Sequence, residues 1–423
     1  MAYNRSARRI TESQRALLLL TLTYTLSMCD RMILSILFPD IKAEFGLSDT
    51  QLGLLGGISF ALFYSIMGLP IARLADSQNR KWIVITSLLV FSLMTALSGL
   101  AGGFISLMIF RIGVGVGEAG VNPASHSIIA DFFPSTRRAS AMSVLMLGAS
   151  LGMIGGYVGG GFLAETYNWR VALVSVGMPG LVLAVLMMKY LSEPDRKVSE
   201  SEVNRAPPRI LLTAAHLWQD KAMRHLIAGS VIAGLTGYGL AQWLPVFFMR
   251  THDLGQTQTG ILMAANFGIL GAIGAVVMGV YFDRLSRNGF EKGMKVLAFI
   301  PFLTAPLFIM GLFAEDIRTS ILFFIIPGFA ANYVIGPTIA MVQTLAPHNM
   351  RAVASAVKML CLNLVGMGLG PLLVGLFSDL LTPVLGPSAL GVALACFTLL
   401  GFLGSFHFWL CARTLANRPE AVE

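Results

Sequence analysis

The chain carries the segment GVYFDRLSR at residues 279–287 and a weaker copy of it, ARLADSQNRK, at residues 72–81. In each copy an aspartate, Asp283 or Asp76, stands four residues after a small residue and is followed by basic side chains. A second pair of matching segments occurs later in each half of the chain: Asn122-Pro123 with Pro134 and Arg137, and Gly336-Pro337 with Pro347 and Arg351. Because the matches are polar and lie at loop positions, they predict two homologous halves in parallel order.

Long apolar runs surround these segments. Of the 423 residues, 55% are hydrophobic and 12% are charged, and the mean hydropathy is +0.73; a soluble domain has a charged fraction of about 25%. A membrane-spanning helix needs about 20 apolar residues. Such runs cover approximately residues 16–39, 49–74, 81–101, 104–132, 138–164, 170–191, 221–250, 257–282, 292–313, 318–346, 351–379 and 388–412.

We therefore expect an all-α membrane protein with twelve transmembrane helices in two pseudo-symmetric six-helix bundles. The expected domains are an N-terminal bundle (1–191), a cytoplasmic linker with an interfacial helix (192–220) and a C-terminal bundle (221–423).

Basic residues orient the chain in the membrane. With both termini in the cytoplasm, the outer loops carry only Lys42, Arg170, Arg250 and Arg318, and the cytoplasmic segments carry Arg5, Arg8, Arg9, Arg15, Arg73, Arg80, Lys81, Arg137, Arg138, Arg196, Lys197, Arg205, Arg209, Arg284, Arg287, Lys292, Lys295, Arg413 and Arg418. This distribution accounts for the net charge of +8, so we expect no nucleic-acid partner. The four cysteines lie in apolar runs and indicate neither a disulfide nor a metal. We expect a monomer without a cofactor in a bacterial-type inner membrane.

Four charged residues fall inside apolar runs of the first half: Asp30, Arg31, Arg111 and Glu118. A charge at the centre of a bilayer costs at least ~2.5 kcal/mol, and these four sum to zero. Helix geometry places Asp30 and Arg111 at a similar depth, ~10–13 Å below the outer end of their spans. One interpretation is a static salt-bridge network; the one we favour is a switchable network. In it Asp30 or Glu118 carries a proton, and Arg31 or Arg111 then binds an anion.

Polar residues extend this prediction. Asn122 continues the helix face of Glu118, and Tyr238, Gln242 and Asn332 are candidate substrate contacts from the second half. The spans of the second half otherwise look apolar and aromatic, which favours a substrate with a charged head and an apolar tail, although such residues also face lipid or neighbouring helices. Lys358 attracts an anion or snorkels to the interface, and we favour snorkelling.

Charged residues of the cytoplasmic loops have a separate expected role. They gate transport by latching the halves together, or they simply anchor the topology: Asp76, Arg80, Lys81, Arg138, Asp283, Arg284 and Arg287.

Segments 68–81 and 279–287 resemble the cytoplasmic signature loop of the major facilitator superfamily. The first copy departs from the pattern at Ala72, Ser77 and Asn79. Arg111 with Gly115, Gly117 and Ala119 is similar to the fourth-span motif of that superfamily. The resemblance covers essentially the whole chain and implies a secondary active transporter that works by alternating access.

A narrower resemblance is to the Spinster branch. It rests on Asp30-Arg31, Pro39-Asp40-Ile41, the segment 48–55, Gly115-x-Gly117-Glu118-Ala119 and Asn168-Trp169-Arg170. It implies proton-coupled transport of an anionic or zwitterionic amphiphile such as a lysophospholipid or a sphingoid phosphate. Some organic-anion symporters share the Gly-Glu and Trp-Arg elements, so proton-coupled transport of small organic anions is the alternative. No nucleophile–base pair, metal cluster or cofactor motif points to an enzyme.

Overall fold

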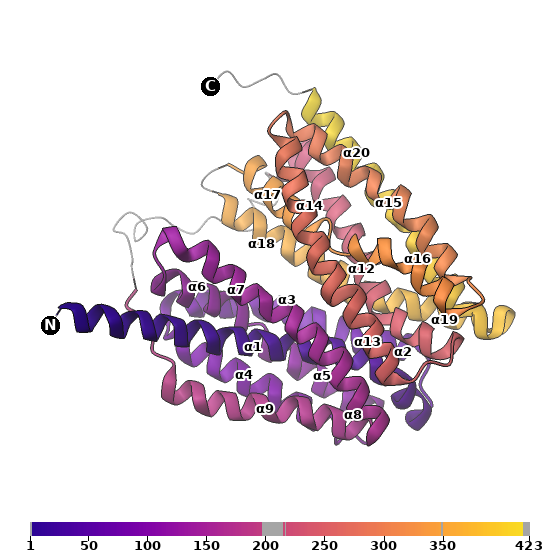
Figure 1. Cartoon of the computed structure of the whole chain (residues 1–423), viewed down its shortest axis with the longest axis horizontal. Coiled ribbons are helices and arrows are strands. Elements are labelled where there is room, and N and C mark those ends of the chain that lie inside the picture. Colours follow the sequence, from indigo (N-terminus) through magenta and orange to yellow (C-terminus); the bar gives the residue numbers. More distant parts are fainter. Residues whose placement is uncertain (1, 197–214, 216, 348–349, 418–423) are drawn as a thin grey trace. The chain divides into compact units, whose positions relative to one another are not determined.

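The computed structural model describes residues 2–196, 215, 217–347 and 350–417, and within them the regular structure is entirely helical (Figure 1). The chain divides into two compact units, the first being Met1–Arg205 with Asp253–Ala264 and the second Ala206–His252 with Ala265–Glu423. Most of the expected linker (192–220) lies outside the described residues, at 197–214 and 216, and residues 215 and 217–219 of it are helical. The expected domain boundaries stay a prediction.

Helices of the first unit cover the six spans of the N-terminal half and the start of the eighth span. They are α1 (Ala2–Phe45), α2 (Asp49–Gly56), α3 (Ile58–Ser77), α4 (Arg80–Ser98), α5 (Phe104–Glu118), α6 (Val121–Phe132), α7 (Ser135–Ile154), the π-helix η1 (Gly155–Gly159), α8 (Gly160–Thr166), α9 (Trp169–Tyr190) and α13 (Gln256–Met263).

The second unit holds most of the C-terminal half. Its helices are α12 (Lys221–Thr251), α14 (Gly271–Ser286), α15 (Phe290–Leu312), α16 (Ile317–Phe329), α17 (Ile335–Leu345), α18 (Arg351–Cys361), the π-helix η4 (Leu362–Leu369), α19 (Gly370–Leu385), the 3₁₀ turn η5 (Gly386–Ser388) and α20 (Ala389–Ala416). A further π-helix, η2 (Ala264–Leu270), joins α13 to α14.

All twelve expected spans correspond to helices. Ten described stretches are long and apolar enough to cross a membrane; the last of them, Val353–Ala416, has 64 residues and contains the eleventh and twelfth spans. The shorter helices Ile317–Phe329 and Ile335–Leu345 make up the tenth span. The prediction of an all-α membrane fold is therefore confirmed.

Interruptions of the spans repeat between the halves. The fourth and tenth spans both break, at Ala119–Gly120 and between Phe329 and Ile335, and the fifth and eleventh both contain a π-helical stretch. The second span breaks at Gly57, and its counterpart, the eighth, contains η2. Breaks and π-bulges in membrane helices cluster at functional sites, so their repetition agrees with the two homologous halves.

Glycines bring the helices of the first unit close together. A Cβ atom on Gly148 would lie 2.7 Å from the Thr21 carbonyl oxygen, and one on Gly156 would lie 2.6 Å from that of Cys29. α7 and η1 therefore pack directly against the backbone of α1, as small residues permit between helices in lipid. Gly115 likewise brings α5 against α3, since a Cβ there would lie 2.5 Å from the Phe60 carbonyl oxygen. These contacts fix the spacing of the helices that carry the buried charges.

The Asn168-Trp169-Arg170 segment closes one end of the first unit. The Trp169 indole Nε1 donates to Glu44 Oε2 at 2.6 Å, and Arg170 pairs with Glu44 Oε1 at 2.5 Å. Arg170 also donates to the carbonyl oxygens of Gly99 and Ala101. The motif therefore ties the start of α9 to the end of α1 and to the loop after α4.

A continuous apolar core organises the second unit, in which α20 packs along both α12 and α15 (Figure 1). Its members include Met223 and Leu226 of α12, Leu297 of α15 and Phe408 of α20. Met341 of α17 reaches the same core, so the second part of the tenth span is anchored by packing although that span is broken.

Candidate substrate and proton-coupling site

Asp30 and Arg111 form a buried ion pair. Arg111 Nη1 lies 2.8 Å from Asp30 Oδ2, and the two side chains are 3% and 1% exposed. The second oxygen, Asp30 Oδ1, accepts a hydrogen bond of 2.5 Å from Thr95 Oγ1 of α4. Both oxygens of Asp30 are therefore bonded, and the pair joins α1, α4 and α5.

Arg31 and Glu118 form a second pair. Glu118 Oε2 accepts from Arg31 Nε at 2.8 Å and from Ser27 Oγ at 2.7 Å, and it lies 2.6 Å from Arg31 Nη2. The Glu118 side chain is fully buried, whereas the Arg31 side chain is 14% exposed. Glu118 is the last residue of α5, directly before the break in the fourth span.

Two aromatic rings of α3 line the arginines. The Arg31 guanidinium carbon lies 4.8 Å from the ring centroids of both Phe60 and Tyr64, and that of Arg111 lies 5.5 Å from the Phe60 ring. Such contacts stabilise a desolvated guanidinium by ~0.5–2 kcal/mol each. The sequence offered no signal for this role, because the rings come from a different helix.

Each of the two ion pairs has one polar atom whose hydrogen bond is not made. Among the described residues, Glu118 Oε1 and Arg111 Nε are buried and have no hydrogen-bond partner. A buried polar atom without a partner costs about 1–3 kcal/mol. Of the two buried carboxylates, Glu118 is the one with an unbonded oxygen among the described residues, because both oxygens of Asp30 accept hydrogen bonds.

The structure thus brings together the four charges that the sequence singled out. They form two ion pairs, and each pair takes one of two consecutive residues of α1, Asp30 or Arg31. Asn122, one turn beyond them, donates from Nδ2 to Tyr64 Oη at 3.2 Å. Asn122 Oδ1 is buried and, within the described part of the chain, has no partner. The polar face therefore continues along α6, as expected.

The candidate contacts of the second half lie in the second unit. Gln242 of α12 is 8% exposed, and its Nε2 finds no acceptor among the described residues. Tyr238 stands one helical turn earlier and is half-buried. Asn332 lies in the break between α16 and α17, where its carbonyl oxygen accepts from the Ile335 amide at 3.2 Å. Their roles as substrate contacts stay predictions.

Lys358 does not snorkel. Its side chain is inside the second unit, with the residue 2% exposed, and Nζ donates to Thr338 Oγ1 at 2.7 Å. The favoured interpretation from the sequence was wrong because the position of Lys358, about two turns into its span, does not determine whether the side chain turns toward lipid or toward α17. The second half consequently contains a buried charge, and the contrast between a charged half and an uncharged half is weaker than expected.

Arg80 is engaged within the first unit. It is 3% exposed and pairs with Asp131 of α6 at 2.5 Å and with Glu193 at 2.8 Å. The Glu193 carboxylate also accepts from the Lys81 amide at 2.7 Å. These bonds hold the start of α4 to α6 and to the segment that follows α9, so in this structure Arg80 stabilises its own unit.

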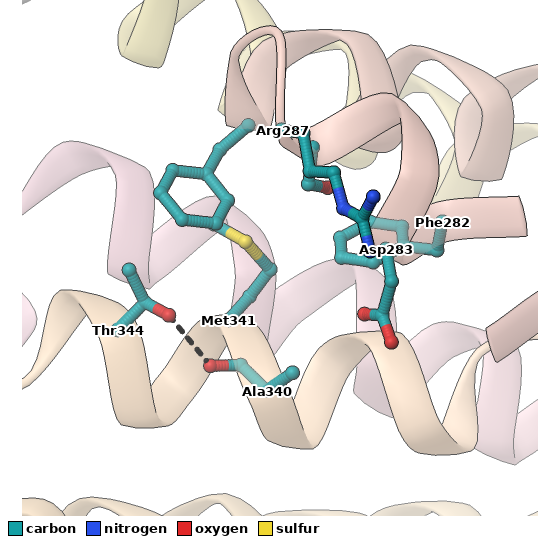
Figure 2. A pocket seen from close by; sticks show the side chains of 8 residues that line it. Phe282, Asp283, Arg287, Ala340, Met341 and Thr344 are labelled. Atoms are coloured by element: carbon teal, nitrogen blue, oxygen red, sulfur yellow. Dashed lines mark hydrogen bonds between the residues drawn. The ribbon is translucent and has the colours of Figure 1, made fainter. Parts of the chain in front are cut away.

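Other residues of the predicted gate have backbone contacts or line a cavity. The Asp76 carbonyl oxygen accepts from Arg196, and Arg138 donates to the Ala130 carbonyl oxygen at 2.8 Å. In the second unit, a cavity of about 340 Å³ has Asp283 and Arg287 at its rim and Phe282 and Met341 among its apolar lining (Figure 2). Arg284 is exposed. The gating role of all seven residues stays a prediction.

The sequence matches the family model described as Major Facilitator Superfamily over residues 20–371. Among curated proteins it is 31% identical to an MFS-type efflux pump of Mycolicibacterium smegmatis, over 93% of this chain and 91% of that protein. It is 26% identical to protein spinster homolog 1 of Homo sapiens, over 94% of this chain and 81% of that protein. It is 28% identical to a hexuronate transporter of Bacillus subtilis, over 66% of each chain.

Two solved structures are similar over nearly the whole chain. They are inward-facing forms, unoccupied and occupied, of a bacterial homolog of the human lysosomal transporter Spinster. Their TM-scores are 0.85 and 0.83, their identities 24% and 25%, and the matches cover 97% and 96% of this chain and 99% and 98% of those chains. The resemblance to the Spinster branch is therefore confirmed, and the relatives and the fold are those of transporters, not enzymes.

Proposed function

Since this chain belongs to the Major Facilitator Superfamily, we propose that it is a proton-coupled secondary transporter that carries an anionic substrate by alternating access. One observation carries the proposal: the fully buried Glu118 uses only Oε2 for its bonds with Arg31 and Ser27, while Oε1 has no hydrogen-bond partner among the described residues.

Protonation of Glu118 would change the net charge of the cluster formed by Asp30, Arg31, Arg111 and Glu118. A proton that forms an O–H bond at Oε1 neutralises the carboxylate, and the sum of the four charges rises from zero to +1. Arg31 then keeps its ring contacts with Phe60 and Tyr64 but loses its counter-charge. A guanidinium in that state binds a carboxylate or a phosphate strongly, in bidentate geometry where the approach allows it.

Asp30 and Arg111 have a different role in this scheme. Both oxygens of Asp30 are already bonded, to Arg111 and to Thr95, so protonation there would break existing hydrogen bonds. We therefore assign proton coupling to Glu118 and substrate contact to Arg31. Asp30 holds Arg111 in place, and Arg111 contributes positive charge to the site.

An amphiphilic anion, such as a lysophospholipid or a sphingoid phosphate, is the first candidate substrate. Its support is the resemblance to the Spinster branch, which extends over 97% of the chain in the structural match. The aromatic rings beside Arg31 add apolar surface next to the anion contact.

A small organic anion is the second candidate. The similarity to a hexuronate transporter, at 28% identity over 66% of the chain, favours it.

Transport by the purified protein in liposomes separates the two candidates. Labelled lysophospholipid, followed by its accessibility to albumin, and labelled glucuronate are each tested with and without an imposed pH gradient. Gradient-dependent movement of the lipid above empty liposomes supports the amphiphile, and movement of glucuronate alone supports the second candidate. If neither moves, both substrate classes are wrong.

Location and topology belong to the same proposal. We place the protein, as a monomer, in a bacterial inner membrane with both termini in the cytoplasm. Cysteines introduced into a cysteine-free variant at Glu315 and at Arg287 test this with an impermeant maleimide on intact cells. The first should react and the second should not; the reverse pattern would overturn the orientation.

A further inference from the structure

Lys358 occupies an unusual position for a cation. It lies two turns into α18, is 2% exposed, and its Nζ donates to Thr338 Oγ1 of α17 at 2.7 Å. An ammonium has three donors, and this hydroxyl satisfies one of them. Within the described part of the chain, no carboxylate lies within ion-pair distance of Nζ.

Burial of an ammonium group costs free energy. Removal of an ion from water costs several kcal/mol in a protein, even after relaxation, unless a counter-charge and hydrogen bonds compensate. The first unit compensates Arg31 and Arg111 with two buried carboxylates, whereas the only partner of the Lys358 ammonium among the described residues is an uncharged hydroxyl. A methionine or leucine would fill the same volume without that cost, so packing does not explain the lysine. An ionisable residue inside a membrane bundle indicates a functional site whose partner must be found.

Two side-chain hydrogen bonds join α17 to α18 in this region. Gln343 Nε2 donates to Ser355 Oγ at 2.7 Å, one turn before the bond between Lys358 and Thr338. Arg351, at the start of α18, is exposed and precedes Lys358 by two turns on the same face, ~10 Å along the axis. An anion that approaches the N-terminal end of α18 therefore meets an exposed cation first and a buried one deeper in the same helix.

We propose that Lys358 is an anion-binding residue of the second half, at which Nζ donates to a carboxylate or phosphate group and Thr338 Oγ1 orients the ammonium. The bound anion supplies the negative charge and the acceptors that the protein itself does not provide. The inference rests on the proposed function only in taking this anion to be part of the transported substrate; the site itself is defined by binding.

Binding to the full-length protein in nanodiscs tests the inference without any transport step. Two matched probe pairs are measured by isothermal titration: lysophosphatidic acid against the monoacylglycerol of the same chain, and glucuronate against its methyl ester. For the pair that the wild type binds, Lys358→Met should weaken the anionic probe at least tenfold and leave the neutral probe unchanged, while Lys358→Arg should largely retain the preference. Lys295→Met, an exposed lysine of the same unit, is the matched control and should behave as wild type.

A purely structural role makes a different prediction. If Lys358 only ties α18 to α17, Thr338→Val should lower the melting temperature as much as Lys358→Met does, and both variants should keep the charge preference. We expect instead that Thr338→Val keeps most of the preference and Lys358→Met loses it. Equal weakening of both probes by Lys358→Met, or a wild type that prefers the anion in neither pair, overturns the inference. Lys358-dependent anion binding in a protein that shows no proton-driven transport would leave this site standing and refute the proposed function alone.

Discussion

Replacement of Glu118 by glutamine should uncouple transport from the proton gradient while the protein still folds. Glutamine keeps an oxygen that accepts from Ser27 and Arg31, but it cannot take up a proton. The change removes the carboxylate that pairs with Arg31, and breaking a buried pair costs ~3–5 kcal/mol. The two ring contacts at 4.8 Å and the 14% exposure of the Arg31 side chain place the expected cost at the lower end of that range.

The size of the transport effect follows from the number of protons carried in each cycle. Because the proposal assigns the proton to a single carboxylate, Glu118, we expect one proton per cycle. A pH difference of one unit is then worth ~1.4 kcal/mol, or about a tenfold change in the substrate ratio across the membrane. The Glu118→Gln variant should show no such dependence and should still catalyse exchange of labelled for unlabelled substrate.

The assay is the equilibrium substrate ratio in proteoliposomes at several imposed pH differences, with the membrane potential clamped. Glu315→Gln, which changes an exposed carboxylate in the loop between α15 and α16, is the control and should keep the wild-type slope. A Glu118→Gln protein that keeps a tenfold change per pH unit would refute the assignment of the proton to Glu118. Loss of the slope in the control would show that the assay reports general damage.

Two further predictions concern stability and packing. Asp30→Asn should lower the free energy of unfolding by ~3–5 kcal/mol, because it leaves Arg111 buried and unpaired, and it should keep the pH slope of transport. Thermal unfolding in detergent measures the change in stability. The double variant Asp30→Asn, Arg111→Gln would contradict the pairing if its loss of stability equalled the sum of the two single losses. Gly156→Ala should cost ~1–3 kcal/mol, because the new Cβ would lie 2.6 Å from the Cys29 carbonyl oxygen, whereas Gly159→Ala has nothing within 4 Å and should cost far less. Equal melting temperatures for the two alanine variants would argue against the close approach of η1 and α1.

The positions of the membrane spans could be predicted from the sequence because every helix that crosses a bilayer needs about 20 apolar residues. Membrane helices also satisfy their own backbone hydrogen bonds, so the twelve runs predicted twelve spans without knowledge of any contact. Breaks within the spans were not predicted. Ala119 and Gly120 form a break that no strong local signal marks, and the π-helical stretches depend on packing against neighbouring helices.

The candidate site was partly predictable for the same reason. A charge in an apolar run is conspicuous in the sequence, and helix periodicity gave the shared depth of Asp30 and Arg111. The choice of partners was a different matter, since Asp30 lies beside Arg31 in the chain but bonds to Arg111, while Arg31 bonds to Glu118. Pairing depends on which face of each helix meets which neighbour.

Hydropathy, charge placement and the internal repeat were thus sufficient to predict the fold class and the charges within the membrane spans. Each of these features depends on whether a single segment is more stable in water or in lipid. Three features required helices to be packed together: the Glu118 oxygen that has no hydrogen-bond partner in the described part of the chain, the aromatic rings over Arg31 and the burial of Lys358. Each depends on side chains from segments far apart in the chain. The free energy of a buried charge is set by those neighbours, and a single helix does not specify them.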